Sequence, residues 1–215
     1  MNPDSQGNPA LSALAALRRF AKPRAPVERC ELCDAPLANE HPHLVEPTDR
    51  RLMCACDPCA LLFCYREGSK YRRVPRRVDF LANFRLTDYE WEALHLPINL
   101  AFFLHSSTAG RVVAFYPSPA GTMESLVGLD AWTELTEANP ILRELEPDVE
   151  ALLVNRVGET REVYRVGIDL CYHLSGLIRM HWRGLAGGQT VWEEIARFFA
   201  GLKERSGPAG GAAHA

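Results

Sequence analysis

The chain has 215 residues, of which 47% are hydrophobic and 24% charged, and its formal net charge at pH 7 is −3. This balance is typical of globular proteins, so it excludes disorder as the main state and argues against a strong basic field for nucleic acid or membrane. No apolar run approaches the roughly 18 residues of a membrane span. The first ten residues lack the basic and apolar regions of a secretory signal, and we therefore expect a cytoplasmic protein.

Changes in composition along the chain predict four segments. Residues 1–28 form a leader arm, either with a short helix over Leu11–Phe20 or only partly ordered. Residues 29–78 form a cysteine-rich metal-binding module with a basic extension. Residues 79–205 form an α+β domain, and the Gly/Ala-rich tail, 206–215, is expected to be disordered.

Six of the seven cysteines lie between residues 30 and 64. They include two Cys-x-x-Cys pairs, Cys30 with Cys33 and Cys56 with Cys59. An odd number of cysteines arranged in tight pairs favours metal binding over disulfides. A tetrahedral ion needs four thiolates about 3.7 Å apart, and a two-residue spacer lets one tight turn supply two of them. We therefore predict a zinc-ribbon-like module with two such knuckles, in which these four cysteines hold one ion.

Zinc is the expected metal for this site. Rubredoxin-like iron sites usually have glycine after the second cysteine of each pair, whereas Asp34 and Ala60 follow here. A single iron is therefore the second choice, and reduced structural cysteines or an iron–sulfur cluster on another cysteine set are further alternatives. Four thiolates close the coordination sphere, and closed zinc sites are structural whereas catalytic sites keep a water position. The pattern thus predicts a scaffold or binding module and no enzyme.

Other residues near the two pairs could substitute as ligands. Cys54 could replace Cys56, and His41 and His43 could also serve, although a histidine pair beside proline is more often exposed polar surface. Cys64 follows an apolar stretch and is expected to be a small buried hydrophobic residue.

A basic segment follows the cysteines directly, and Pro75 within it favours an extended chain. Its candidate partner-binding residues are Arg72, Arg73, Arg76 and Arg77. A zinc knuckle followed by arginines can bind nucleic-acid phosphates. Because the net charge is negative, we prefer an acidic protein partner to nucleic acid.

The first part of the α+β domain shows a helix and then two strands. Thr87 and Glu90 form a capping box within residues 79–97, which we expect to be helical. The apolar runs Leu100–His105 and Arg111–Tyr116 flank a turn and predict a pair of buried strands.

A similar pattern recurs later in the chain. Strands are expected over Val149–Val157 and Arg161–Ile168, followed by helices over Leu170–Arg183 and Val191–Lys203. Two β-hairpin–helix units could pair into one four-stranded antiparallel sheet covered by helices, which is an α+β architecture.

Polar residues mark where the expected helices begin. Thr122 and Asp130 are candidate caps for two helical stretches after the first hairpin, the second ending at Glu137. Asp169 is the candidate cap of the helix after the second hairpin, and Thr190 with the glutamate three residues later forms a capping box for the last helix.

Several motifs are distributed over most of residues 29–202. They are Cys30-Glu-Leu-Cys33, Cys54-Ala-Cys-Asp-Pro-Cys59, Tyr116-Pro-Ser-Pro-Ala-Gly121, Pro147-Asp-Val-Glu-Ala-Leu-Leu153, Asp169-Leu-Cys-Tyr172 and His181-Trp-Arg-Gly-Leu-Ala-Gly-Gly188. In these motifs the chain resembles the DUF5947 family of uncharacterised, nickel–iron hydrogenase-associated proteins. The resemblance implies an accessory role in assembly or electron relay and carries no assigned catalytic residues.

Together these features predict a non-enzymatic accessory protein with a structural four-cysteine zinc site. Its expected partner is a protein, with a hydrogenase subunit or maturation factor as the class that the resemblance implies. The alternatives are a rubredoxin-like single-iron electron-transfer protein and a zinc-containing nucleic-acid-binding regulator.

Overall fold

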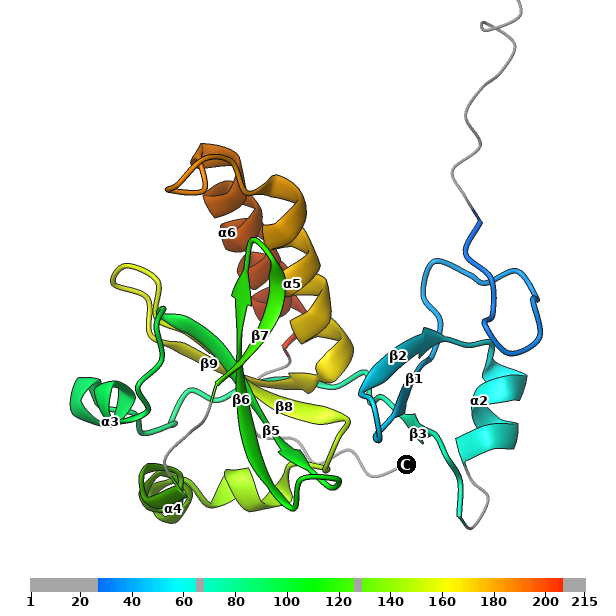
Figure 1. Ribbon diagram of the computed structural model, residues 1–215, viewed down its shortest axis with the longest axis horizontal. Coiled ribbons are helices and arrows are strands. Elements are labelled where there is room, and N and C mark those ends of the chain that lie inside the picture. Colours follow the sequence, from blue (N-terminus) through cyan, green and yellow to red (C-terminus); the bar gives the residue numbers. More distant parts are fainter. Residues whose placement is uncertain (1–26, 65–67, 126–128, 207–215) are drawn as a thin grey trace, which may run out of the picture.

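The computed structural model describes residues 27–64, 68–125 and 129–206. The expected helix over Leu11–Phe20 and the tail from residue 207 lie outside the described residues. The described chain forms a small three-stranded sheet with one helix, and a six-stranded sheet with helices on both faces (Figure 1). Among the described residues, no helix has both the length and the apolar character needed to cross a membrane.

The small sheet belongs to the cysteine-rich module. Its strands are β1 (His43–Glu46), β2 (Arg51–Cys54) and β3 (Arg72–Arg73), in the antiparallel order β2-β1-β3, and α2 (Asp57–Cys64) follows β2. The core of this module consists of six buried and mostly small side chains, those of Cys30, Leu44, Met53, Ala55, Cys59 and Ala60. So little apolar burial gives the module limited stability of its own.

The large sheet contains six antiparallel strands in the order β4-β9-β8-β5-β6-β7. They are β4 (Val78–Phe80), β5 (Leu100–Ser106), β6 (Arg111–Ser118), β7 (Gly121–Ser125), β8 (Glu150–Asn155) and β9 (Glu162–Gly167). The four central strands are the two expected hairpins, paired with each other through β5 and β8. Both edge strands, β4 and β7, extend the sheet beyond the four strands expected.

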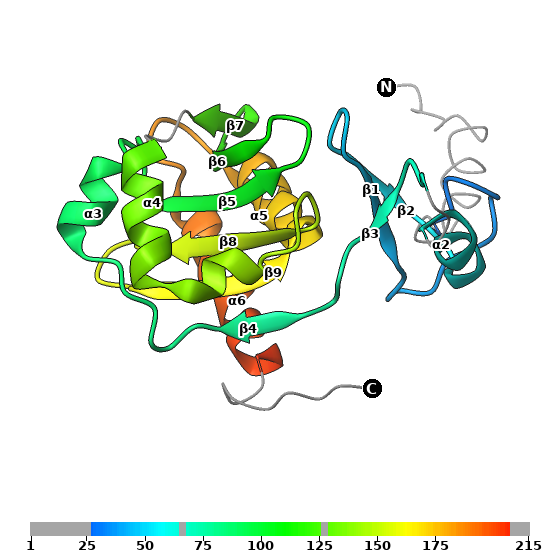
Figure 2. The same ribbon diagram turned by 90° about the horizontal axis from the view of Figure 1, so that it is seen from below.

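Helices cover both faces of this sheet (Figure 2). Helices α5 (Ile168–His181) and α6 (Gln189–Arg205) lie on one face. Helices α3 (Asp88–Ala93) and α4 (Leu129–Ala138) and the 3-10 helix η1 (Pro140–Glu144) lie on the other.

The two covered faces explain the uninterrupted apolar sequence of β5 from Leu100 to Leu104. Phe102 and Leu104 join the cluster beneath α5 and α6, whereas Ala101 and Phe103 join the cluster beneath α3 and α4. Successive side chains of a strand point to opposite faces, so a strand that is covered on both sides needs apolar residues at every position.

Two stretches expected to be helical contain strands. Within residues 79–97, only Asp88–Ala93 is α-helical, behind the expected Thr87 capping box, and the segment begins in strand β4. Thr122 begins no helix, because it pairs with Pro117 in the β6–β7 hairpin. Gly121, with φ of 118°, allows the tight turn that brings the chain back along β6.

The helix starts also differ from the expected caps. Helix α4 begins one residue before Asp130. Gly167 is the N-cap of α5, so Asp169 lies in its first turn, and Gly188 is the N-cap of α6, so Thr190 lies inside that helix. The side chain of Asp169 is thereby free to reach the cysteine-rich module.

Polar contacts join the module and its linker to the large sheet and its helices. Among the described residues, three ion pairs cross this junction, namely Arg50–Glu124 at 2.8 Å, Arg72–Asp148 at 3.7 Å and Arg77–Glu150 at 3.5 Å, and Nδ1 of His43 lies 2.8 Å from Oδ2 of Asp169. The chain also packs closely there, since a Cβ atom on Gly167 would lie 2.5 Å from the carbonyl oxygen of Pro75. The module is therefore fixed to the domain at several points.

Candidate metal centre

The structure brings the four predicted cysteines together. The sulfur atoms of Cys30, Cys33, Cys56 and Cys59 all lie within 4.8 Å of one another, and those of Cys33 and Cys56 are 3.6 Å apart. This separation is close to the roughly 3.7 Å between thiolates around a tetrahedral zinc ion. It far exceeds the S–S bond of about 2.05 Å, and all four residues are free cysteines. The four thiols are thus placed to bind one metal ion.

The first pair lies in a tight loop closed by an isolated bridge between Arg29 and Pro36. The N–H of Cys30 donates to the carbonyl of Ala35, and the N–H of Asp34 donates to the carbonyl of Cys30. Asp34 has φ of 61°, the left-handed conformation that glycine usually provides in this position. The guanidinium of Arg29 contacts both the carbonyl and the carboxylate of Asp34, so an ion pair supports this conformation.

The second pair departs from the expected second knuckle, because it lies at the start of a helix. Cys56 immediately precedes α2, and Cys59 lies in its first turn. Asp57 and Pro58 both favour a helix start, through charge at the positive end of the helix dipole and through a preset φ. The predicted convergence of the two pairs is therefore confirmed, and the second pair spans a helix start.

The electrostatics of the cluster suit a bound cation. Burial raises the pKa of the Cys30 thiol, but backbone N–H groups, foremost that of Cys56, outweigh it and lower the pKa to about 6. For Cys59, burial and then the neighbouring cysteine side chains raise the pKa above its usual value. Four adjacent thiols cannot all ionise without a positive charge between them, which a metal ion would supply.

The three expected substitutes form a cluster of their own. Ligand atoms of His41, His43 and Cys54 lie within 4.8 Å of one another. Cys54 lies directly opposite His43 in the β1–β2 register, so the pleated hairpin brings these two side chains together. Cys54 therefore does not take the place of Cys56 in the four-cysteine cluster.

Asp169 is a polar neighbour of this second cluster that the sequence did not reveal. Its Oδ2 lies 2.8 Å from Nδ1 of His43, although 126 positions separate the two residues. Its position in the sequence, directly before the expected helix, suggested only a cap.

Cys64 packs, half-buried, against the module core. Burial raises the pKa of its thiol, which outweighs the opposite effect of the nearby Arg73 guanidinium. Cys64, expected to be a small buried hydrophobic residue, is thus only half-buried, and it belongs to neither cluster of candidate metal ligands.

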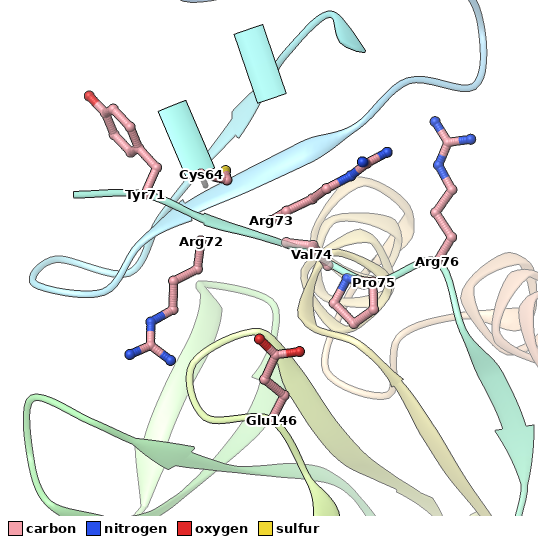
Figure 3. Close-up of a pocket in the computed structure, with 8 residues that line it drawn as sticks. All are labelled: Cys64, Tyr71, Arg72, Arg73, Val74, Pro75, Arg76 and Glu146. Carbon is pink, nitrogen blue, oxygen red and sulfur yellow. The ribbon is translucent and has the colours of Figure 1, made fainter. Parts of the chain in front are cut away.

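The four candidate partner-binding arginines lie along β3 and the linker to β4. The linker borders a cleft of about 520 Å³, and Figure 3 shows Arg72, Arg73 and Arg76 pointing in different directions around it. Arg72 and Arg77 pair with carboxylates of the domain, and Arg73 lies 3.6 Å from Asp57. Arg76 is exposed and forms no ion pair among the described residues. Most of this positive charge is therefore used within the molecule.

A family model matches residues 29–206, and its description is a family of unknown function, DUF5947. The chain belongs to this family. Comparison with the curated proteins gives no match, and comparison with the solved structures gives none either. The family match spans both the cysteine-rich module and the α+β domain.

Proposed function

We propose that this chain is a non-enzymatic accessory protein whose module is held by a structural zinc ion on Cys30, Cys33, Cys56 and Cys59. The observation that supports this proposal is the convergence of four thiols from two separate segments within 4.8 Å. Four thiolates fill a tetrahedral coordination sphere and leave no position for water or substrate, so the ion would stabilise the fold and would not catalyse a reaction.

The small core of the module explains why an ion would be needed. Leu44 and Met53 are the largest of its fully buried side chains, and the others are alanines and cysteines. A structural zinc ion contributes about 10–16 kcal/mol of apparent binding free energy in small zinc-dependent peptides. That contribution would compensate for the small apolar area that the module buries.

The role that we propose for the module is to dock a protein partner on its linker side. Arg76 is exposed and carries a charge without an ion pair in the described part of the chain, which suits an acidic surface. The proposed partner class, a nickel–iron hydrogenase subunit or maturation factor, rests on the family resemblance alone.

Elemental analysis of the purified full-length chain tests the metal. We expect zinc, and we expect Cys33→Ser to lose the ion of the four-cysteine cluster without creating a core cavity, because Cys33 is exposed. Cys64→Ser is the matched control and should keep that ion. Iron in place of zinc, with a red protein, would favour the rubredoxin-like alternative.

Copurification from cells that express the hydrogenase tests the partner. Enrichment of a hydrogenase component with the wild-type chain is expected, with loss in Arg76→Glu and retention in the control Arg179→Glu on α5. No enrichment of any hydrogenase component would contradict the partner class. Salt-dependent binding of nucleic acid would instead favour the regulator alternative.

A further inference from the structure

His41 in the second cluster has a buried nitrogen without a partner. Its side chain is 6% exposed, and Nε2 has no hydrogen-bond partner among the described residues. Nδ1 lies 2.9 Å from the carbonyl oxygen of Ala38, to which it can donate its proton. This tautomer leaves a lone pair on the buried Nε2, and a buried acceptor without a partner is destabilising.

His43 is oriented in the manner of a metal-binding histidine. Its Nδ1 lies 2.8 Å from Oδ2 of Asp169, and the two rings of His41 and His43 meet edge to face at 4.9 Å. A carboxylate that accepts the proton of one ring nitrogen fixes the tautomer and makes the other nitrogen a better ligand. Nε2 of His43 is therefore also available to a cation.

Cys54 supplies the third ligand atom, and carboxylates lie close to the cluster. The thiol is half-buried, and its backbone N–H donates to Glu31 Oε1 at 2.9 Å. On the other side, Glu28 Oε2 lies 3.6 Å from Nδ1 of His41. The cluster thus combines two imidazoles and one thiol with carboxylates close by, a setting that favours a cation.

We propose that His41, His43 and Cys54 form a second metal site, which takes a divalent transition-metal ion such as Zn²⁺. Imidazole and thiolate together suit this borderline-soft ion. The site uses none of the four cysteines of the structural cluster and so does not rest on the function proposed above. Its candidate ligand atoms, one from each residue, all lie within 4.8 Å of one another.

The second site would differ from the first in keeping a coordination position open. Three protein ligands leave a fourth position for water or a small anion, as in catalytic zinc sites. The side chain of His43 is 27% exposed, so the site lies within reach of solvent. Asp169 is a positioning residue that ties this site to helix α5.

Zinc titration of the full-length chain, reduced and stripped of metal, tests the proposal. We expect about two ions per chain for the wild type and about one for His41→Gln or Cys54→Ser. The matched controls, His95→Gln and Cys64→Ser, replace a histidine and a cysteine outside both clusters and should still bind about two.

The outcomes separate the two sites. A wild type that binds one ion, retained in Cys54→Ser and lost in Cys33→Ser, would overturn the second site and leave the structural one. A wild type that binds one ion, retained in Cys33→Ser and lost in Cys54→Ser, would support the second site and overturn the structural one.

Two further measurements keep the test decisive if a variant folds poorly. Co²⁺ bound to the wild type should show a second absorption component with weak thiolate character that shifts on addition of azide, and a spectrum of four-thiolate type alone would contradict the site. Asp169→Asn should weaken the second ion about 10- to 100-fold while the first is unaffected. Equal weakening of both ions would indicate a structural role only.

Discussion

The cysteine-rich module and the six-stranded domain differ in the size of their apolar cores. Phe102, Phe103 and Tyr164 are completely buried in the domain, where two apolar clusters cover both faces of the sheet. In the module, Leu44 and Met53 are buried among alanines and cysteines. Apolar burial grows with the size of a core, so the domain can fold through burial alone, whereas the function proposed above makes the module depend on an ion.

The two regions are nevertheless joined through a shared layer of packing. Val45 of β1 and Val74 of the linker are buried in the same apolar cluster as α5 and α6. The module therefore packs against the domain. A change that destabilises one of the two regions at this junction should also lower the stability of the other.

Of the changes considered, removal of metal should have the largest effect, because it should unfold the module and leave the domain folded. A strong chelator under reducing conditions should abolish the hydrogen-exchange protection of residues 29–64, because the metal supplies about 10–16 kcal/mol in comparable zinc peptides. The amides of β5 and β8 should keep their protection. Hydrogen exchange measured by mass spectrometry with and without the chelator checks both regions in one experiment.

The matched variants are Cys59→Ser, which should reproduce the effect of the chelator, and Cys64→Ser, which should not. If residues 29–64 remain protected after complete removal of metal, apolar packing alone stabilises the module and the contrast between the regions disappears.

The domain contains a buried ion pair whose disruption should lower its stability. The Arg165 side chain, 7% exposed, contacts the Glu150 carboxylate, 1% exposed, at 2.5 Å. Arg165→Leu would leave that carboxylate with the backbone N–H of Glu146 at 2.9 Å and the half-exposed Arg77 at 3.5 Å, and breaking a buried pair costs about 3–5 kcal/mol. Chemical denaturation should show this loss in the domain transition. The double variant with Glu150→Leu should recover much of it, and an equally unstable double variant would show that packing, not charge, is responsible.

The features that could be predicted from sequence are those set by near neighbours in the chain. The Thr87 capping box, the paired apolar runs around residues 100–116 and the two close cysteine pairs each follow from local geometry. The apolar runs also indicated burial on both faces, because an exposed strand face would require alternating polar residues.

The features that could not be predicted depend on contacts between distant segments. Strand β4 exists because Val78 and its neighbours pair with β9, and three residues carry too little pattern to distinguish strand from helix. Asp169 contacts His43 only because the folded domain places α5 beside the module. The pairing of His43 with Cys54 follows from the β1–β2 register, which the spacing of these residues does not reveal.

A methyl group at Gly167 would disturb the junction itself. Its Cβ would lie 2.5 Å from the Pro75 carbonyl oxygen and 2.8 Å from the Val74 side chain. Gly167→Ala should therefore displace the linker and cost about 1–3 kcal/mol, as overpacking does. Gly201→Ala on α6, where nothing lies within 4 Å of the added atom, should instead be neutral or stabilising. Thermal denaturation compares the two, and equal stability would show that the linker yields without cost.

The smallest expected effect concerns a single hydroxyl in the domain core. Burial, with the nearby Glu162 carboxylate, raises the pKa of Tyr164 from its usual 10 to about 12. The unfolded chain then ionises first as the pH rises, so the contribution of the neutral phenol to stability is complete below pH 10 and declines between pH 10 and 12. Tyr164→Phe should change stability by less than about 1 kcal/mol at neutral pH and flatten this alkaline decline. Denaturant titrations at neutral and alkaline pH test it, and an unchanged alkaline slope would place the responsible group elsewhere.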